Sequence, residues 1–246
     1  MRPRCHILFV LLFALPILME AQAVDTSVVR VPLFRIDQSQ SSPQPAILRP
    51  VPAATVGTSL LVGASPFFFE PSRRQNILVR ERVQLYRRNT FDHRYFSFDN
   101  YTQFLPIGSV IALNLFGVKS VHPMPQLVVR SASTMLASAV LVHPIKFAVT
   151  EWRPNRSSST SFPSGHTAFA FAGAELLRLE YSETSTLIPV AGYLVASLTG
   201  FMRVFNDCHW TGDVLAGAAI GIIAADLSWL LNNALESKIR NSRHRR

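Results

Sequence analysis

The chain has 246 residues, a length that suits one ordinary domain or one compact membrane bundle and leaves little for a second core. Of these residues 48% are apolar and only 16% are charged, which is little charge for the wetted surface of a soluble protein. The net charge of +9 comes mostly from arginines spread over several segments, a pattern that argues against nucleic-acid binding and favours anionic lipid or phosphate esters. We therefore expect a membrane-associated protein.

The amino-terminal segment, residues 1–23, has the features of a secretory signal peptide. A basic start precedes the apolar run 7–19, and Ala-Gln-Ala at 21–23 is a small-x-small cleavage signal. The alternative is an uncleaved first membrane anchor, although the run is short for a span. Residues 24–51, rich in Pro, Ser and Gln, predict a flexible exported segment. Because the other cysteine lies in the signal, we expect Cys208 to be unpaired and buried as a small apolar residue.

Residues 52–236 predict a helical domain. Six apolar stretches are typical of helices: 52–69, 104–118, 133–150, 167–179, 187–202 and 214–231. Several are shorter than the roughly 20 residues of a perpendicular span, but small residues in 168–174 and 216–221 allow the close helix approach of membrane bundles. We therefore predict an all-α, membrane-embedded bundle of about six helices, with a soluble all-α core as the alternative. A basic tail, 237–246, follows.

An arginine-rich segment, residues 72–101, separates the first two apolar stretches. It carries seven arginines with aromatic residues among or just after them. This composition is typical of a solvated or interfacial helix, with a substrate-binding surface as the alternative.

Three polar clusters interrupt the apolar pattern in the carboxyl-terminal half, each at the end of an expected helix. They are Lys146 with Arg153-Pro154, then Pro163-Ser164-Gly165-His166, then Arg203 with His209 and Asp213. Phosphoryl transfer needs fixed positive charges and N–H donors around the phosphate oxygens, because charge is spread over them in the transition state. The groups that meet this need are Lys146, Arg153, Arg203 and the backbone N–H groups of Ser164 and Gly165 at a helix amino terminus.

Two histidines add a nucleophile and a proton source. His209 and Asp213 are four residues apart, so a helical turn places the carboxylate against one ring nitrogen and leaves the other free to attack phosphorus. His166 is then the general acid for the leaving oxygen, and water hydrolyses the phosphohistidine. Taken alone, His209 and Asp213 also fit a buried hydrogen-bonded pair or two metal ligands. Lys146 and Arg153 alone also fit snorkelling charges at a helix end.

The ordered pattern K-x6-R-P, P-S-G-H and R-x5-H-x3-D resembles the signature of the type 2 phosphatidic acid phosphatase superfamily, which includes bacterial acid phosphatases and vanadium haloperoxidases. The resemblance covers roughly residues 99–231 and implies the same roles, with His209 as nucleophile. Two departures stand out. Met202 replaces a usual serine, which removes a hydrogen bond to the phosphate site, and the stretch 154–163 is shorter than usual.

The basic tail provides an expectation for topology. If it stays in the cytoplasm, the last helix runs inward from His209 and the catalytic residues lie outside. After an exported amino terminus one of the six stretches must then fail to cross. We expect this to be 52–69, which is short and leaves the segment 72–101 on the outer surface. Seven arginines outside oppose the positive-inside rule, and the opposite topology places the site in the cytoplasm. We predict a bacterial inner membrane protein with its active site facing the periplasm.

The resemblance is also to bacterial envelope enzymes that include lipid A phosphatases. It implies a lipid phosphate phosphatase acting on lipid A, the 4′ position favoured over the 1 position, with the bilayer and a lipid phosphate as partners and no cofactor or metal. Alternatives are an undecaprenyl diphosphate phosphatase and a soluble periplasmic nonspecific acid phosphatase. A noncatalytic lipid-phosphate binding or transport protein is the alternative of another class.

Overall fold

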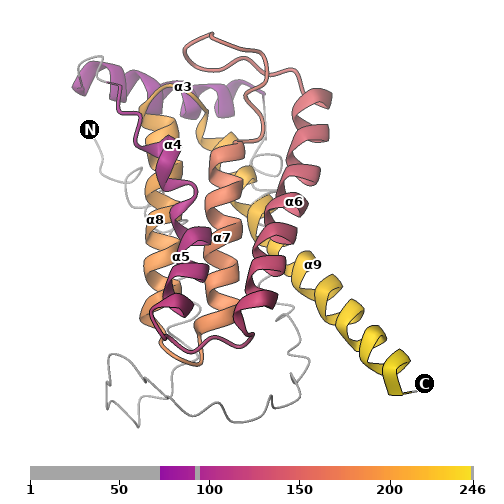
Figure 1. The fold of residues 1–246 in the computed structure, drawn as a ribbon. Coiled ribbons are helices and arrows are strands. Elements are labelled where there is room, and N and C mark those ends of the chain that lie inside the picture. Colours follow the sequence, from indigo (N-terminus) through magenta and orange to yellow (C-terminus); the bar gives the residue numbers. More distant parts are fainter. Residues whose placement is uncertain (1–72, 92–94, 245–246) are drawn as a thin grey trace.

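A computed structural model describes residues 73–91 and 95–244, and the predicted signal peptide, the exported segment and the stretch 52–69 lie outside these residues. The described chain is helical, with one isolated β-bridge between Glu151 and Thr160 (Figure 1). Its helices are α3 (Arg73–Thr90), α4 (Asp99–Thr102), α5 (Leu105–Leu115), α6 (Met124–Ala148), α7 (Gly165–Tyr181), α8 (Leu187–Phe205) and α9 (Thr211–His244). The all-α prediction is confirmed.

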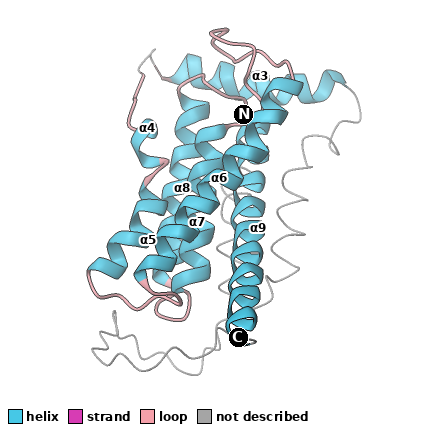
Figure 2. Ribbon diagram, turned by 45° about the vertical axis from the view of Figure 1, so that its right-hand side comes forward, coloured by secondary structure: helices cyan, strands magenta, loops and turns pink. Residues whose placement is uncertain are grey.

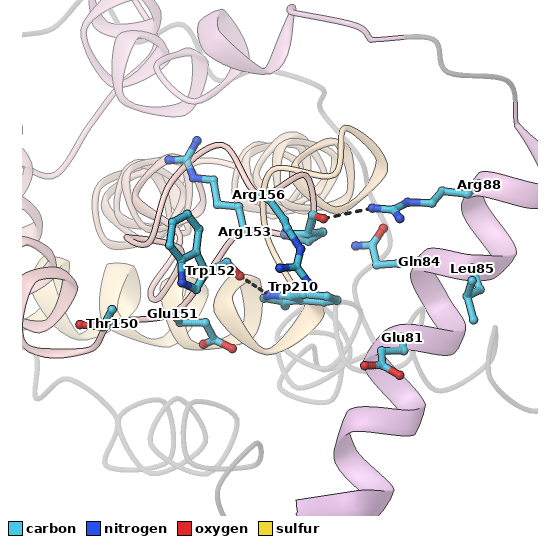
Figure 3. Close-up of a pocket in the computed structure, with 11 residues that line it drawn as sticks. Glu81, Gln84, Leu85, Arg88, Thr150, Glu151, Trp152, Arg153, Arg156 and Trp210 are labelled. Atoms are coloured by element: carbon cyan, nitrogen blue, oxygen red, sulfur yellow. Dashed lines mark hydrogen bonds between the residues drawn. The ribbon is translucent and has the colours of Figure 1, made fainter.

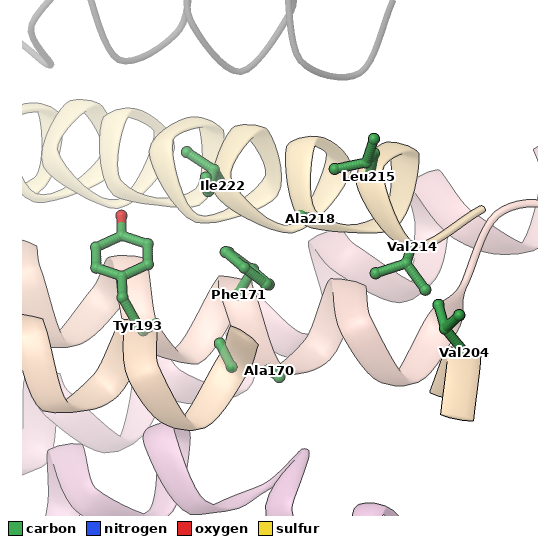
Figure 4. Close-up of a cluster of buried hydrophobic side chains, with 10 residues drawn as sticks. Ala170, Phe171, Tyr193, Val204, Val214, Leu215, Ala218 and Ile222 are labelled. Atoms are coloured by element: carbon green, nitrogen blue, oxygen red, sulfur yellow. The ribbon is translucent and has the colours of Figure 1, made fainter. Parts of the chain in front are cut away.

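Helix α7 occupies the centre of the bundle, with α5, α6 and α8 around it and α9 behind (Figure 1). One buried apolar cluster joins α7, α8 and α9 through Phe171, Tyr193 and Ile222 (Figure 4). A second joins α5, α6, α7 and α9, with Val110 and Trp229 among its members. Most residues of α7 are buried, so this helix forms the core against which the other helices pack.

Glycines allow α9 to pack directly against α7. A Cβ atom on Gly217 would lie 2.4 Å from the carbonyl oxygen of Ser164, and one on Gly221 would lie 2.2 Å from that of Ala168. Both distances are shorter than any real carbon–oxygen contact, so only glycine fits. The predicted close helix approach in 216–221 is therefore confirmed.

Replacing Gly221 tests this packing. We expect Gly221→Ala to lower the free energy of unfolding by about 1–3 kcal/mol, because the added methyl group pushes α9 away from the α7 backbone. The measurement is the thermal midpoint of the detergent-solubilised protein. Gly108→Ala in α5 is the matched control, since nothing lies within 4 Å of its Cβ position. Equal midpoints for the two variants would rule out the close approach as a source of stability.

Three helices in the described part of the chain, α6, α8 and α9, are long and apolar enough to cross a membrane, and α5 is a shorter apolar helix. Large apolar side chains point outward from all three long helices, among them Leu136, Phe201 and Leu231. Such exposed apolar surface suits lipid rather than water. The predicted membrane-embedded bundle is therefore confirmed.

Two helices, α6 and α9, extend well beyond the stretches that the sequence predicted. α6 begins at Met124 rather than at 133, because Arg130, although charged, is buried against α9. Its guanidinium donates to Asn233 at 2.7 Å and to Glu236 at 3.0 Å and lies over the Trp229 ring. α9 in turn continues to His244, so most of the predicted basic tail is helical.

Part of the arginine-rich segment forms α3, which lies across one end of the bundle (Figure 2). This agrees with the predicted surface helix. The short helix α4 leads from it into α5.

Candidate active site

The three polar clusters meet at the end of the bundle that α3 covers (Figure 1). Lys146 lies in the last turn of α6 and Arg203 in the last turn of α8. His166 lies in the first turn of α7 and Asp213 in the first turn of α9. Since α7 and α9 run opposite to α6 and α8, the four helix ends converge, and the prediction of a site at helix ends is confirmed.

His209 lies in the short connection between α8 and α9 and is only 1% exposed. Its Nδ1 atom lies 3.5 Å from an oxygen of Asp213 and 3.5 Å from the hydroxyl of Ser161. The same Asp213 oxygen accepts hydrogen bonds from the Ser161 hydroxyl and from the backbone N–H of Trp210. Asp213 is thereby fixed beside one side of the imidazole, which leaves Nε2 as the ring atom directed away from it.

Burial sets the charge of this histidine. Desolvation, with the positive charges of Arg203, Lys146 and Arg153, holds the pKa of His209 well below its usual 6.5. The ring is therefore neutral at neutral pH, the form in which a ring nitrogen has a free lone pair.

Hydrogen bonds hold two of the three predicted phosphate-binding cations, Arg203 and Lys146, in place. Arg203 is buried and donates from Nη1 to Asp99 at 2.7 Å. Lys146 donates from Nζ to the backbone oxygen of Thr160 at 2.8 Å. The Nε atoms of Arg203 and Arg153 are buried without a hydrogen-bond partner among the described residues. A buried, incompletely paired guanidinium is costly, and a bound anion offsets that cost.

The structure corrects the predicted use of one donor. The backbone N–H of Ser164 donates to the carbonyl oxygen of Asp213 at 2.9 Å, and the Ser164 hydroxyl pairs with Thr167. This N–H is therefore engaged in joining α7 to α9 and is not directed at a phosphate. Gly165, the first residue of α7, keeps the predicted place at a helix amino terminus.

Sequence reasoning missed two residues of α4. Asp99 is fully buried and accepts hydrogen bonds from Arg203 and, at 3.3 Å, from Asn206. Asn100 lies with its side-chain oxygen 3.0 Å from Nε2 of His166. The available signal was an Asp-Asn pair directly before an apolar helix, at the start of the stretch that resembles the superfamily.

Helix α3 is attached to the loop that carries His209. Gln84 donates from Nε2 to the backbone oxygens of His209 at 3.4 Å and Val204 at 3.5 Å. Arg87 donates to Asp207 at 2.6 Å. Asp207 has a φ of 55°, a left-handed conformation that is uncommon for a residue with a side chain. These contacts join residues more than 100 positions apart in the sequence, and they hold the loop in place.

A pocket of about 590 Å³ lies between α3, the loop after α6 and the start of α9 (Figure 3). Arg153 belongs both to this pocket and to the cation cluster around His209. The described residues contain no group of three or more His, Cys, Asp or Glu side chains suited to a metal ion. Cys208 is buried and unpaired, as predicted, and burial raises its thiol pKa.

Comparison with known families decides the relationship. Residues 127–236 match the model of the PAP2 superfamily. This part of the chain belongs to the PAP2 superfamily. The PAP2 match contains all eight predicted site residues, and it confirms the resemblance to type 2 phosphatidic acid phosphatases.

Individual relatives agree with the PAP2 assignment. The chain is 32% identical over 234 residues to a protein named lipid A 1-phosphatase from Porphyromonas gingivalis, an alignment that covers 93% of this chain and 50% of the relative. It is 37% identical over 81 residues to lipid phosphate phosphatase 2 of Arabidopsis thaliana, 28% of each chain. The chain thus spans half or less of the length of these relatives.

A solved structure shares the fold. The transmembrane PAP2 type phosphatidylglycerolphosphate phosphatase of Bacillus subtilis matches with a TM-score of 0.51 and 19% identity, over 76% of this chain and 96% of that one. At this identity the likeness concerns the arrangement of helices alone.

Proposed function

We propose that the chain is a lipid phosphate phosphatase that works through a phosphohistidine on His209. The observation that carries the proposal is the convergence of a buried, neutral histidine with Lys146, Arg153 and Arg203 at four helix ends. Arg203 is buried and Lys146 and Arg153 are half-buried, and three cations so close together are costly unless an anion binds among them. A neutral imidazole beside that anion supplies the nucleophile.

The reaction follows from this geometry in two steps. Nε2 of His209 attacks the phosphorus, and the bond from phosphorus to the leaving oxygen breaks. The imidazole becomes positively charged, and Asp213 beside Nδ1 stabilises that charge. Water then attacks the phosphohistidine, which releases inorganic phosphate and restores the neutral ring. Lys146, Arg153 and Arg203 bind the phosphoryl oxygens throughout.

His166 is proposed to protonate the leaving oxygen. In the site without phosphate, burial and the charge of Arg203 lower the pKa of His166 to about 4. A bound phosphate ester brings negative charge next to the ring and raises that pKa, so the acid form becomes available when the substrate is present. Asn100 orients the ring from the α4 side.

The position of the site supports a lipid substrate. It lies at the end of helices that are suited to cross a membrane, so a phosphate headgroup reaches the site while the lipid chains stay in the bilayer. We propose lipid A as this lipid. The Porphyromonas gingivalis relative is named for the 1 position and gives no support to the 4′ preference, so we favour the 1-phosphate.

We also propose an inner membrane location with the site facing the periplasm. α9 starts at the site and ends at the opposite end of the bundle, where Lys238, Arg240 and Arg243 lie (Figure 1). Basic residues favour the cytoplasmic side, and their position supports an outward-facing site.

A substrate panel tests the proposed function. We expect the detergent-solubilised protein to release phosphate from lipid A 1-phosphate at least about tenfold faster, in kcat/KM, than from the 4′ position or from a small soluble ester. Undecaprenyl diphosphate and phosphatidic acid complete the panel. Preferential cleavage of undecaprenyl diphosphate would replace lipid A by that alternative, and binding without turnover of any member would contradict an enzyme.

A further inference from the structure

Apart from Arg153, the residues that line the pocket beside the catalytic cluster have no part in the proposed phosphoryl transfer (Figure 3). Arg153 forms part of its wall, and Trp210 directly follows His209. The pocket therefore adjoins the cation cluster through Arg153. A group joined to a phosphate in that cluster can extend into it.

Two indole rings give the pocket an apolar but fixed surface. Trp210 donates from its ring N–H to the backbone oxygen of Trp152 at 2.7 Å, which holds the two residues together. Trp152 is 57% exposed, so its ring is accessible to a ligand. Figure 3 shows Trp152 and Trp210 on the side of the pocket across from α3, with Trp210 the nearer of the two to Gln84.

Polar residues line both sides of the pocket. Glu81, Gln84 and Arg88 come from α3, whereas Glu151 and Arg156 come from the loop that carries Trp152. Gln84 is 4% exposed and its Nε2 is fixed by two backbone oxygens, whereas its Oε1 has no hydrogen-bond partner in the part of the chain that the structure describes. A hydroxyl group of a ligand supplies the missing donor.

The residues that line the pocket favour some classes of ligand over others. Arginine and glutamate side chains make the pocket unsuitable for an acyl chain. A glycerol unit is too small for a pocket whose volume is in the range that holds a whole small-molecule ligand. A sugar ring fits both walls, because its C–H face packs on an indole while its hydroxyl groups pair with amide, carboxylate and guanidinium groups.

We propose that this pocket is a saccharide-binding subsite that holds the sugar carrying the reacting phosphate. The proposal rests on the proposed phosphatase activity and makes it more specific. It assigns recognition of the headgroup to Trp152, Gln84 and their neighbours, and leaves the phosphate to the cation cluster. The substrate class is then a lipid in which the phosphate is attached to a sugar ring, as in lipid A 1-phosphate.

The test compares a sugar-linked with a glycerol-linked lipid phosphate in the full-length protein. We expect Trp152→Ala to lower the ratio of kcat/KM for lipid A to kcat/KM for phosphatidic acid by about tenfold or more. Trp152→Phe keeps an aromatic face and should hold the ratio within about threefold of the wild type. Phe116→Ala is the control, since this exposed ring lies at the far end of α5. An unchanged ratio in Trp152→Ala, or equal losses on both lipids, would overturn the subsite.

Binding of soluble headgroups separates this proposal from the phosphatase itself. Tryptophan fluorescence of the His209→Ala variant is titrated with glucosamine 1-phosphate and with glycerol 3-phosphate. We expect the sugar phosphate to bind at least about tenfold more tightly, and this difference to vanish when Trp152→Ala is added. If phosphatidic acid is hydrolysed but the two headgroups bind equally, the subsite fails while the phosphatase stands. If no lipid is hydrolysed but the difference persists, the phosphatase fails instead.

Discussion

Replacing His209 by alanine is expected to lower kcat on the best lipid substrate by about four orders of magnitude or more, because the variant has no atom that can form the covalent intermediate. His209→Asn should lose as much, since an amide has a similar polarity but is not a nucleophile. The measurement is phosphate release by each purified variant, with the thermal midpoint as a check that the fold is retained.

His143 supplies the matched control for this prediction. It is an exposed histidine on α6 whose ring contacts the backbone of Ala139. His143→Ala should keep activity within about twofold, as expected for a surface side chain. Activity above about one per cent of wild type in both His209 variants would exclude His209 as the attacking residue.

Arg203→Lys is the second change with a large expected effect. Arg203 uses Nη1 to bind Asp99, and in the proposed mechanism the other N–H groups of its planar guanidinium bind the phosphate. A lysine ammonium at this position cannot serve both partners with the same geometry. We expect kcat/KM to fall by about 10²–10³-fold, the usual effect of losing one fixed donor to a developing negative charge.

Arg130→Lys is the control for a buried arginine. Arg130 is 1% exposed and also pairs with a carboxylate, that of Glu236, but it lies between α6 and α9 and not at the helix ends that carry the site. This change should lower the thermal midpoint and leave kcat/KM per folded molecule within about threefold. If both variants lose activity in parallel with their stability, the phosphate-binding role of Arg203 is wrong.

The sequence predicted the positions of those site residues that depend on where a helix begins or ends. Lys146, Arg203 and His166 occupy the first or last turn of a helix, and the apolar stretches that flank them predicted those turns. His209 and Asp213 are neighbours as the four-residue spacing predicted, but His209 lies in the connection before α9 and not in a helical turn, and Asp213 points back toward it from the first turn of α9. The superfamily resemblance added their roles, which remain proposals.

Other features depended on contacts that no local pattern predicts. Asp99 pairs with Arg203 across 104 residues, and Gln84 reaches the His209 backbone across 125. The early start of α6 depended on partners of Arg130 on α9. Ser164 was assigned to the phosphate because helix amino termini bind anions, but packing against α9 had already engaged its N–H.

The most direct test of the account is to capture the covalent intermediate. The enzyme is mixed with lipid labelled with ³²P in the reacting phosphate and quenched within one turnover in alkali, in which phosphohistidine is stable. The account predicts label on a peptide that contains His209 and none in His209→Ala. Release of one equivalent of dephosphorylated lipid without alkali-stable label on the protein, or label on a peptide that lacks His209, would contradict it.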